Sequence, residues 1–115
     1  MYSAELLDHF EHPRNCGDLP DATSRTRIEN PVCGDILELA VKIAGGHIDE
    51  VRFRARGCVP AMACASAVTE LAKGKSVDEA RAIDKEDVIG AVGSLPPASG
   101  HAAQLAVDAL RAVLK

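Results

Sequence analysis

The stretch ILELAVKIAGGHIDEVRFRARG, residues 36–57, decides the fold of this chain. In residues 36–43 every second position is apolar and charged residues stand among the others, which is the period of a strand with one buried face. Residues 48–57 alternate in the same way. Between the two segments, Gly45 and Gly46 can adopt the positive φ of a tight turn. The stretch therefore predicts a β-hairpin.

The residues before the hairpin add a helix and a further strand. Residues 23–30, TSRTRIEN, alternate more weakly and predict a third antiparallel strand. Residues 3–11 have apolar side chains at helical spacing, with Ser3 as a suitable N-cap. This helix should end at His12, because a residue before proline is disfavoured in the α region.

After the hairpin the apolar period becomes helical. The patterns predict helices over residues 60–73, 76–83, 84–92 and 101–115. Pro60 near the start and Gly74 past the end suit the first of these, and Ser76 with Glu79 forms a capping-box pattern in the second. The order of elements predicts one α+β domain over residues 1–115, a short three-stranded antiparallel sheet with helices packed on one face.

Composition excludes several classes of function. The chain has 115 residues, 47% hydrophobic and 26% charged, which suits a single globular domain. Its net charge of -4 disfavours a surface for nucleic acid or anionic membranes. No apolar run has the length of a membrane span, and the first fifteen residues lack the basic start and apolar core of a signal peptide.

Four cysteines indicate the compartment: Cys16, Cys33, Cys58 and Cys64. Since nothing in the sequence indicates secretion, we expect a cytoplasmic protein whose thiols are reduced. Cysteines in that setting serve as metal ligands or reactive groups more often than as disulfides.

Several polar residues fall at the ends of predicted elements. Cys33 and Asp35 precede the first hairpin strand, Cys58 follows the second, and His101 begins the last helix. Antiparallel pairing brings the start of one hairpin strand beside the end of the other. The hairpin should therefore deliver both thiols to one edge of the sheet, and His101 joins them if its helix begins there.

Two thiolates, a carboxylate and an imidazole could bind zinc or a small iron–sulfur cluster with mixed ligation. Because Cys58 precedes a helix, we expect its pKa to be lowered by the helix N-terminus. The pattern contains no C-x-x-C pair. Spacing alone therefore does not decide between a metal site and a simple turn. Pro31, Gly34 and Asp35 are all common turn residues.

Five ordered blocks carry a resemblance: LLDHFEHPRN, NPVCGD, RFRARGC, AVTELAKGKS, and SLPP ahead of a histidine. Together they span nearly the whole chain, which resembles the U-type iron–sulfur cluster assembly scaffolds, the IscU family and the N-terminal domain of NifU. Members of that family accept sulfur from a cysteine desulfurase, assemble a [2Fe–2S] cluster and pass it to apo iron–sulfur proteins. The resemblance implies the same role here, as a scaffold or carrier and not an enzyme.

Carried over by position, Cys33, Asp35, Cys58 and His101 match four of the family's five site residues. The resemblance implies that they bind a transient [2Fe–2S] cluster, or Zn²⁺ in the protein as isolated, with Asp35 as fourth ligand or as a group that labilises the cluster. The fifth family residue, a cysteine after the histidine, is Ala102 here. That cysteine is implicated in accepting sulfur, so sulfur acceptance must be rerouted or absent in this chain.

The segment LPPASGH departs from the family in a second way. Its first three residues match the segment that members present to Hsp70/J-type chaperones, but Ala98 and Ser99 replace the expected valine and lysine, which weakens the inference of a chaperone partner. Two alternative functions remain at this point. One is a zinc-bound sulfur acceptor that works with a cysteine desulfurase, although the insertion typical of that branch is absent; the other is a degenerate regulator that occupies the desulfurase.

The remaining candidates have simpler interpretations. We expect Cys16 to fill an apolar gap, the alternative being that it replaces the missing third thiol, and we expect Cys64 to be a buried small side chain. The other histidines, His9, His12 and His47, are expected to be surface or packing residues. Three alternating arginines, Arg52, Arg54 and Arg56, predict the solvated face of a strand, which could also dock an acidic partner.

Overall fold

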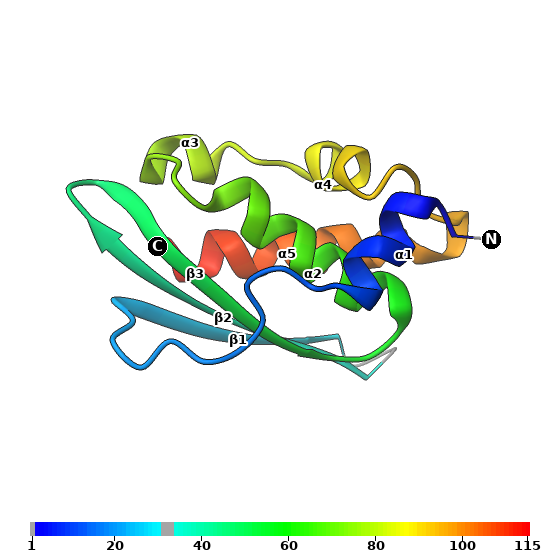
Figure 1. Ribbon diagram of the computed structural model, residues 1–115, viewed down its shortest axis with the longest axis horizontal. Helices are drawn as coiled ribbons and strands as arrows, with labels where there is room; N and C mark the ends of the chain where they lie inside the picture. The colour runs from blue at the N-terminus through cyan, green and yellow to red at the C-terminus, as the bar shows by residue number, and fades with distance from the viewer. Residues whose placement is uncertain (1, 31–33) are drawn as a thin grey trace.

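The computed structural model describes residues 2–30 and 34–115. Three antiparallel strands, β1 (Ser24–Asn30), β2 (Asp35–Ala44) and β3 (His47–Arg56), form one sheet in the order β1-β2-β3. Figure 1 shows the sheet as one layer, with the helices covering a single face of it. The predicted α+β architecture and the third strand are confirmed.

The register of the hairpin determines which residues meet at the end of the sheet. Ile36 pairs with Arg56 and Leu39 with Phe53, while on the other side of β2 Asn30 of β1 pairs with Asp35. The first residues of β2 therefore lie beside the last residues of β1 and β3. This end of the sheet carries the predicted site.

In the described ranges the fold also has five α-helices and one 3₁₀ turn: α1 (Ala4–Glu11), α2 (Val59–Ala72), α3 (Val77–Arg81), α4 (Lys85–Ala91), η1 (Pro97–Ser99) and α5 (Gly100–Val113). The predicted caps are present, since the Ser3 hydroxyl accepts from the N–H of Leu6, and Ser76 and Glu79 form the reciprocal capping box. The segment predicted as a loop before the last helix contains η1, and the other helix boundaries shift by a residue or two.

The core lies between the sheet and helices α2 and α5. Leu37, Leu39 and Phe53 point inward from the sheet, and α2 is buried on nearly every side because alanines let its neighbours approach closely. Cys64 belongs to this core and is fully buried, as predicted. Burial raises its pKa to about 12, so the thiol stays protonated and unreactive.

A buried polar network fastens α1 to α2. His9 is only 4% exposed, and its Nδ1 lies 2.8 Å from the hydroxyl oxygen of Ser66. The same oxygen accepts a hydrogen bond from the backbone N–H of Arg14, while Thr69 donates to the carbonyl of Ser66. His9 is thus a packing residue, one of the two alternatives predicted for it. Burial first, and the charge of Arg14 second, lower its pKa.

Across the described residues, no helix combines the length and the apolar character needed to cross a bilayer.

Candidate metal centre

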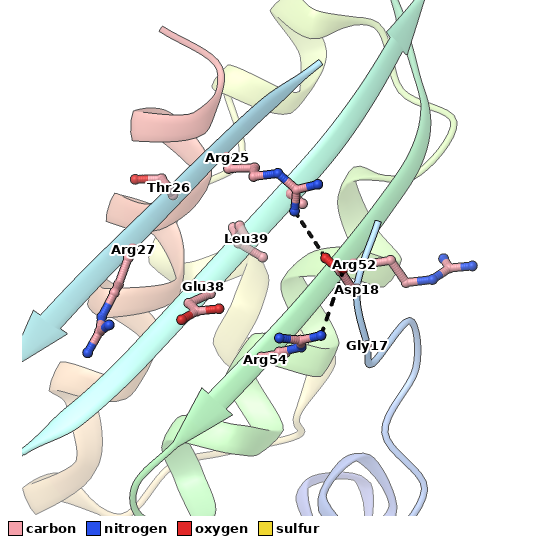
Figure 2. A pocket seen from close by; sticks show the side chains of 10 residues that line it. Gly17, Asp18, Arg25, Thr26, Arg27, Glu38, Leu39, Arg52 and Arg54 are labelled. Atoms are coloured by element: carbon pink, nitrogen blue, oxygen red, sulfur yellow. Dashed lines mark hydrogen bonds and ion pairs between the residues drawn. The ribbon is translucent and has the colours of Figure 1, made fainter. Parts of the chain in front are cut away.

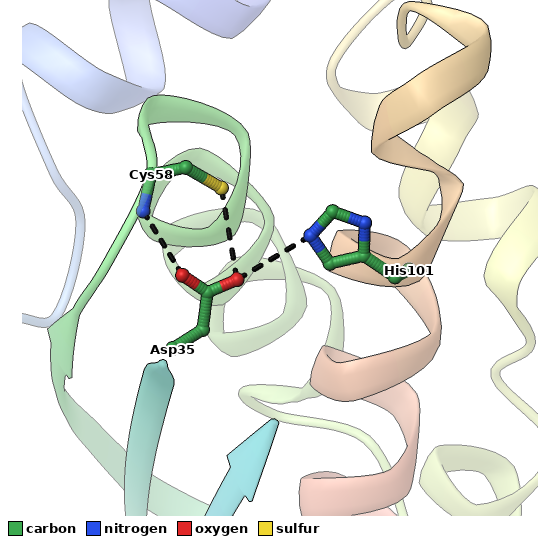
Figure 3. A group of neighbouring side chains, drawn as sticks. All are labelled: Asp35, Cys58 and His101. Atoms are coloured by element: carbon green, nitrogen blue, oxygen red, sulfur yellow. Dashed lines mark hydrogen bonds and ion pairs between the residues drawn. The ribbon is translucent and has the colours of Figure 1, made fainter. Parts of the chain in front are cut away.

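Three of the four predicted ligands converge where the sheet meets the starts of two helices. Asp35 is the first residue of β2, Cys58 is the N-cap of α2, and His101 lies in the first turn of α5. Figure 3 shows the three side chains pointing toward one another from these separate elements. One ligand atom from each lies within 4.8 Å of the other two.

The carboxylate of Asp35 is the centre of the group. The residue is 1% exposed, and its Oδ1 accepts a hydrogen bond from the backbone N–H of Cys58 at 3.1 Å. Asp35 thereby satisfies an N-terminal amide of α2, which the side chain of Cys58 does not cap. Its carboxylate is therefore directed to another element, which a simple turn does not require.

Gly57 makes room for this carboxylate, a role that our sequence analysis missed. A Cβ at residue 57 would overlap Oδ1 of Asp35, and the φ of Gly57 is +154°. Both features favour glycine at this position. The glycine next to Cys58 in the sequence was the available signal, but it acquires meaning only once Asp35 is placed against it.

The Cys58 thiol differs from our expectation. Its pKa is raised, first by partial burial and further by the charge of Asp35, whose Oδ2 lies 3.7 Å from Sγ. The expected lowering by the start of α2 is wrong, because desolvation and a neighbouring carboxylate outweigh the helix N-terminus. Without a metal the thiol keeps its proton at neutral pH and directs it at Asp35. A metal ion must displace this proton when it binds.

His101 supplies the third donor. Its Nε2 lies 3.4 Å from Oδ2 of Asp35 and is buried, yet within the described part of the chain it makes no hydrogen bond. A buried ring nitrogen without a hydrogen bond, aimed at a carboxylate and near a thiol, is suited to metal ligation. The donor set of sulfur, nitrogen and oxygen fits zinc and mixed-ligand iron–sulfur clusters.

The fourth predicted ligand, Cys33, lies outside the described residues, as does Pro31 of the proposed turn. Its role stays a prediction, based on its place in the sequence two residues before Asp35. Ala102, which stands where the family has a cysteine, is 1% exposed and belongs to the apolar core. That position contributes no donor to the centre.

Cys16 is exposed, so the prediction that it fills an apolar gap is wrong. The flanking backbone pairs with β3, since Gly17 donates to the carbonyl of Phe53 and Phe53 donates to that of Asn15. The main chain on both sides of Cys16 is therefore hydrogen-bonded to β3, while the Cys16 thiol stays exposed. Among the described residues, Cys16 is not one of the donors that gather around Asp35.

Comparison with known proteins agrees with the fold and with the resemblance. The family model described as "NifU-like N terminal domain" matches residues 1–115. The chain is 42% identical to iron-sulfur cluster assembly scaffold protein IscU 1 of Archaeoglobus fulgidus, over 96% of this chain and 72% of that protein. It is 39% identical to the IscU scaffold protein of Escherichia coli, over 98% of this chain and 91% of that protein.

A solved structure shows the same fold at lower sequence identity. The putative iron-sulfur cluster assembly scaffold protein for the SUF system of Fervidobacterium islandicum superimposes with a TM-score of 0.84 at 22% identity, covering 99% of this chain and 96% of that one. The match of the family model over the whole chain and the identity to the curated relatives decide its membership. The chain belongs to the IscU/NifU N-terminal domain family.

Proposed function

We propose that this chain is an iron–sulfur cluster assembly scaffold that holds a [2Fe–2S] cluster as cargo and passes it to apo iron–sulfur proteins. The observation that carries the proposal is the convergence of Asp35, Cys58 and Nε2 of His101, a nitrogen without a hydrogen bond among the described residues, in a member of this family. Cys33 supplies the second thiolate. The scaffold works in the cytoplasm and carries out no turnover chemistry of its own.

The ligand set explains how a cluster could be held and released. Two thiolates bind the irons strongly, while the imidazole and the carboxylate are weaker ligands for an iron–sulfur unit. Asp35 already has an alternative partner in the N–H of Cys58, so its carboxylate can leave the metal without becoming an unpaired buried charge. Asp35 therefore serves as the ligand that makes release possible.

Sulfur is supplied by a cysteine desulfurase. Because Ala102 offers no thiol, sulfur acceptance falls to Cys33 or Cys58, whose thiolate attacks the outer sulfur of the desulfurase persulfide and displaces the enzyme thiolate. Metal bound beside Cys58 would deprotonate it and prepare it for this step. Recognition by Hsp70/J-type chaperones through LPPAS stays a prediction.

Anaerobic reconstitution with ferrous iron, cysteine, a desulfurase and a thiol reductant, which reduces the persulfide sulfur to sulfide, tests the proposal. We expect visible charge-transfer bands and matched iron and sulfide in the same sample. His101→Ala and Cys58→Ser should each lose most of the cluster. Cys16→Ser, which changes an exposed thiol outside the group, should keep it.

The alternatives give different results in this experiment. A colourless protein that retains zinc and forms a persulfide would overturn the scaffold and favour a sulfur acceptor. A protein that binds the desulfurase but takes up neither iron, zinc nor sulfur would favour the regulator.

A further inference from the structure

The outer face of the sheet carries a cluster of arginines on the side away from the helices. Figure 2 views this face, with the helices behind the strands and the arginine side chains in front of them. We call this surface the arginine face. It comprises two residues of β1 and three of β3, which alternate with inward residues along each strand: Arg25, Arg27, Arg52, Arg54 and Arg56.

The register places the arginines on either side of the central strand. Arg27 and Arg54 flank Glu38, and Arg25 and Arg52 flank Ala40. Successive arginines along one strand are about 7 Å apart, because alternate residues of a strand repeat at that distance. The face is therefore a regular array of positive charge on either side of β2, whose outward residues are Ile36, Glu38 and Ala40.

Two adjoining hollows run along this face. The larger, of about 290 Å³, extends from Gly17 across Ala40 to Arg54, and the second, of about 270 Å³, continues past Ile36 to Arg56. Among the described residues, five arginines and two carboxylates, Asp18 and Glu38, line these hollows, although the whole chain has a net charge of -4. Charge on this face is thus opposite in sign to that of the chain.

Asp18 shows what this surface can bind. It reaches over the sheet from the loop before β1, and its carboxylate lies 3.0 Å from Arg25 of β1 and 4.0 Å from Arg54 of β3 (Figure 2). One carboxylate can therefore engage arginines from opposite strands. At the rim, Glu29 pairs with Arg27 and Glu50 with Arg52. The ion pairs of Arg25 and Arg27 are exposed and contribute little to stability, so incoming carboxylates can compete for these two arginines, whereas the Arg52–Glu50 pair is half-buried.

We propose that the arginine face docks an extended acidic segment of a partner protein, with carboxylates at alternate positions and small apolar side chains between them. Such a segment repeats at the same distance of about 7 Å as the arginines, so several carboxylates can be paired at once. Its carboxylates would point at the arginines and the side chains between them away from the sheet, because successive side chains of an extended segment point to opposite faces. Asp35 points to the opposite side of the sheet, so this docking needs no metal.

The observations favour a polypeptide over other anions. Arg52, Arg54 and Arg56 span about 14 Å of strand, more than one small anion can contact. Nucleic acid is disfavoured because base stacking needs aromatic platforms, and the one aromatic side chain of these strands, Phe53, is 2% exposed and points into the core.

The probe is a fluorescein-labelled peptide of alternating glutamate and alanine. Its binding to the full chain is measured by fluorescence anisotropy at low and at moderate salt. We expect saturable binding that weakens with salt, and no binding of the matched peptide with glutamine in place of glutamate. The triple variant Arg27→Gln, Arg54→Gln, Arg56→Gln should bind at least about tenfold more weakly, since charge-assisted hydrogen bonds are lost.

A second triple variant has the same charge change at exposed lysines away from the face: Lys75→Gln, Lys85→Gln and Lys115→Gln. It should bind the peptide nearly as well as the parent chain. An equal loss in both variants would overturn the proposal, because binding would then follow net charge alone. It would also be overturned if the glutamine peptide bound as well, if pyrophosphate displaced the peptide at equal concentration, or if single-stranded oligonucleotide bound more tightly.

Discussion

Oδ1 of Asp35 accepts a hydrogen bond from the backbone N–H of Cys58 at 3.1 Å, which ties the first residue of β2 to the start of α2. The same carboxylate lies 3.4 Å from Nε2 of His101 through its other oxygen. The centre is thus preassembled by a single buried group that contacts both of its neighbours. This arrangement makes Asp35 important for the fold as well as for the proposed metal binding.

Removal of the Asp35 carboxylate should therefore lower stability even without metal. Asp35→Ala leaves the N–H of Cys58 without its acceptor, and we expect a loss of about 1–2 kcal/mol in the free energy of unfolding. Asp35→Asn keeps an oxygen acceptor in a side chain of the same shape, so its free energy of unfolding should fall by less. Urea denaturation of both variants measures the difference, and equal losses would show that the hydrogen bond to Cys58 does not stabilise α2.

The space at Gly57 leads to a second prediction. Gly57→Ala puts a methyl group into Oδ1 of Asp35, so it should weaken zinc binding and lower the unfolding free energy by about 1–3 kcal/mol. Gly74→Ala is the matched control, because Gly74 also has positive φ but nothing lies within 4 Å of an added Cβ.

Both substitutions carry a backbone cost, but only the one at Gly57 should change zinc affinity. Calorimetric titration with zinc separates the two effects. If Gly74→Ala weakened zinc binding as much as Gly57→Ala, the account of the Asp35 pocket would be wrong.

Burial of His9 predicts a pH dependence of folding. The pKa of His9 is lowered in the folded protein, mainly by burial, despite Glu70 at 3.8 Å from Nε2. Below its ordinary pKa of about 6.5 the unfolded chain binds more protons than the folded chain. This contribution to stability should therefore be lost progressively as the pH falls from about 6.5 to the lower folded pKa.

The measurement is the urea midpoint at a series of pH values, compared between the parent chain and His9→Gln. The variant should show a smaller decline in stability toward acid. His12→Gln, a change at an exposed histidine, should leave the decline as it is. An unchanged decline in His9→Gln would assign the acid sensitivity to other groups.

The two cysteines outside the proposed ligand set should react at very different rates. Cys16 is exposed and should be alkylated quickly by iodoacetamide in the native protein, whereas Cys64 is fully buried with a pKa of about 12 and should react only after unfolding. Mass spectrometry of digests taken over time locates the label. Rapid labelling of Cys64 in the native state would mean that α2 opens far more readily than its packing indicates.

The hairpin and the helices could be predicted because each depends on a local pattern. Alternation in residues 36–57 and the capping box at Ser76 act within a few residues, so a linear sequence contains them. Antiparallel pairing also predicted that the ends of the hairpin bring Cys33 and Cys58 to one edge of the sheet. Cys33 lies outside the described residues, so that pairing stays a prediction, while Asp35, two residues on, does lie against Cys58.

Properties set by tertiary surroundings were not predictable in the same way. The Cys58 pKa depends on how far the thiol is desolvated and on the carboxylate beside it, neither of which follows from its place before a helix. Cys16 was expected to be buried, but its neighbours are satisfied through main-chain pairing with β3. The role of Gly57 arises from a contact between elements, and for that reason the glycine looked like an ordinary strand end.

The central claim is that a chain with Ala102 in place of the family cysteine still assembles a cluster. Native mass spectrometry of the anaerobically reconstituted protein tests it most directly, because the mass identifies what is bound. The account predicts a chain that carries two irons and two sulfides, and the loss of that species in His101→Ala. A chain that carries only a single zinc ion, or nothing, after the same treatment would contradict it.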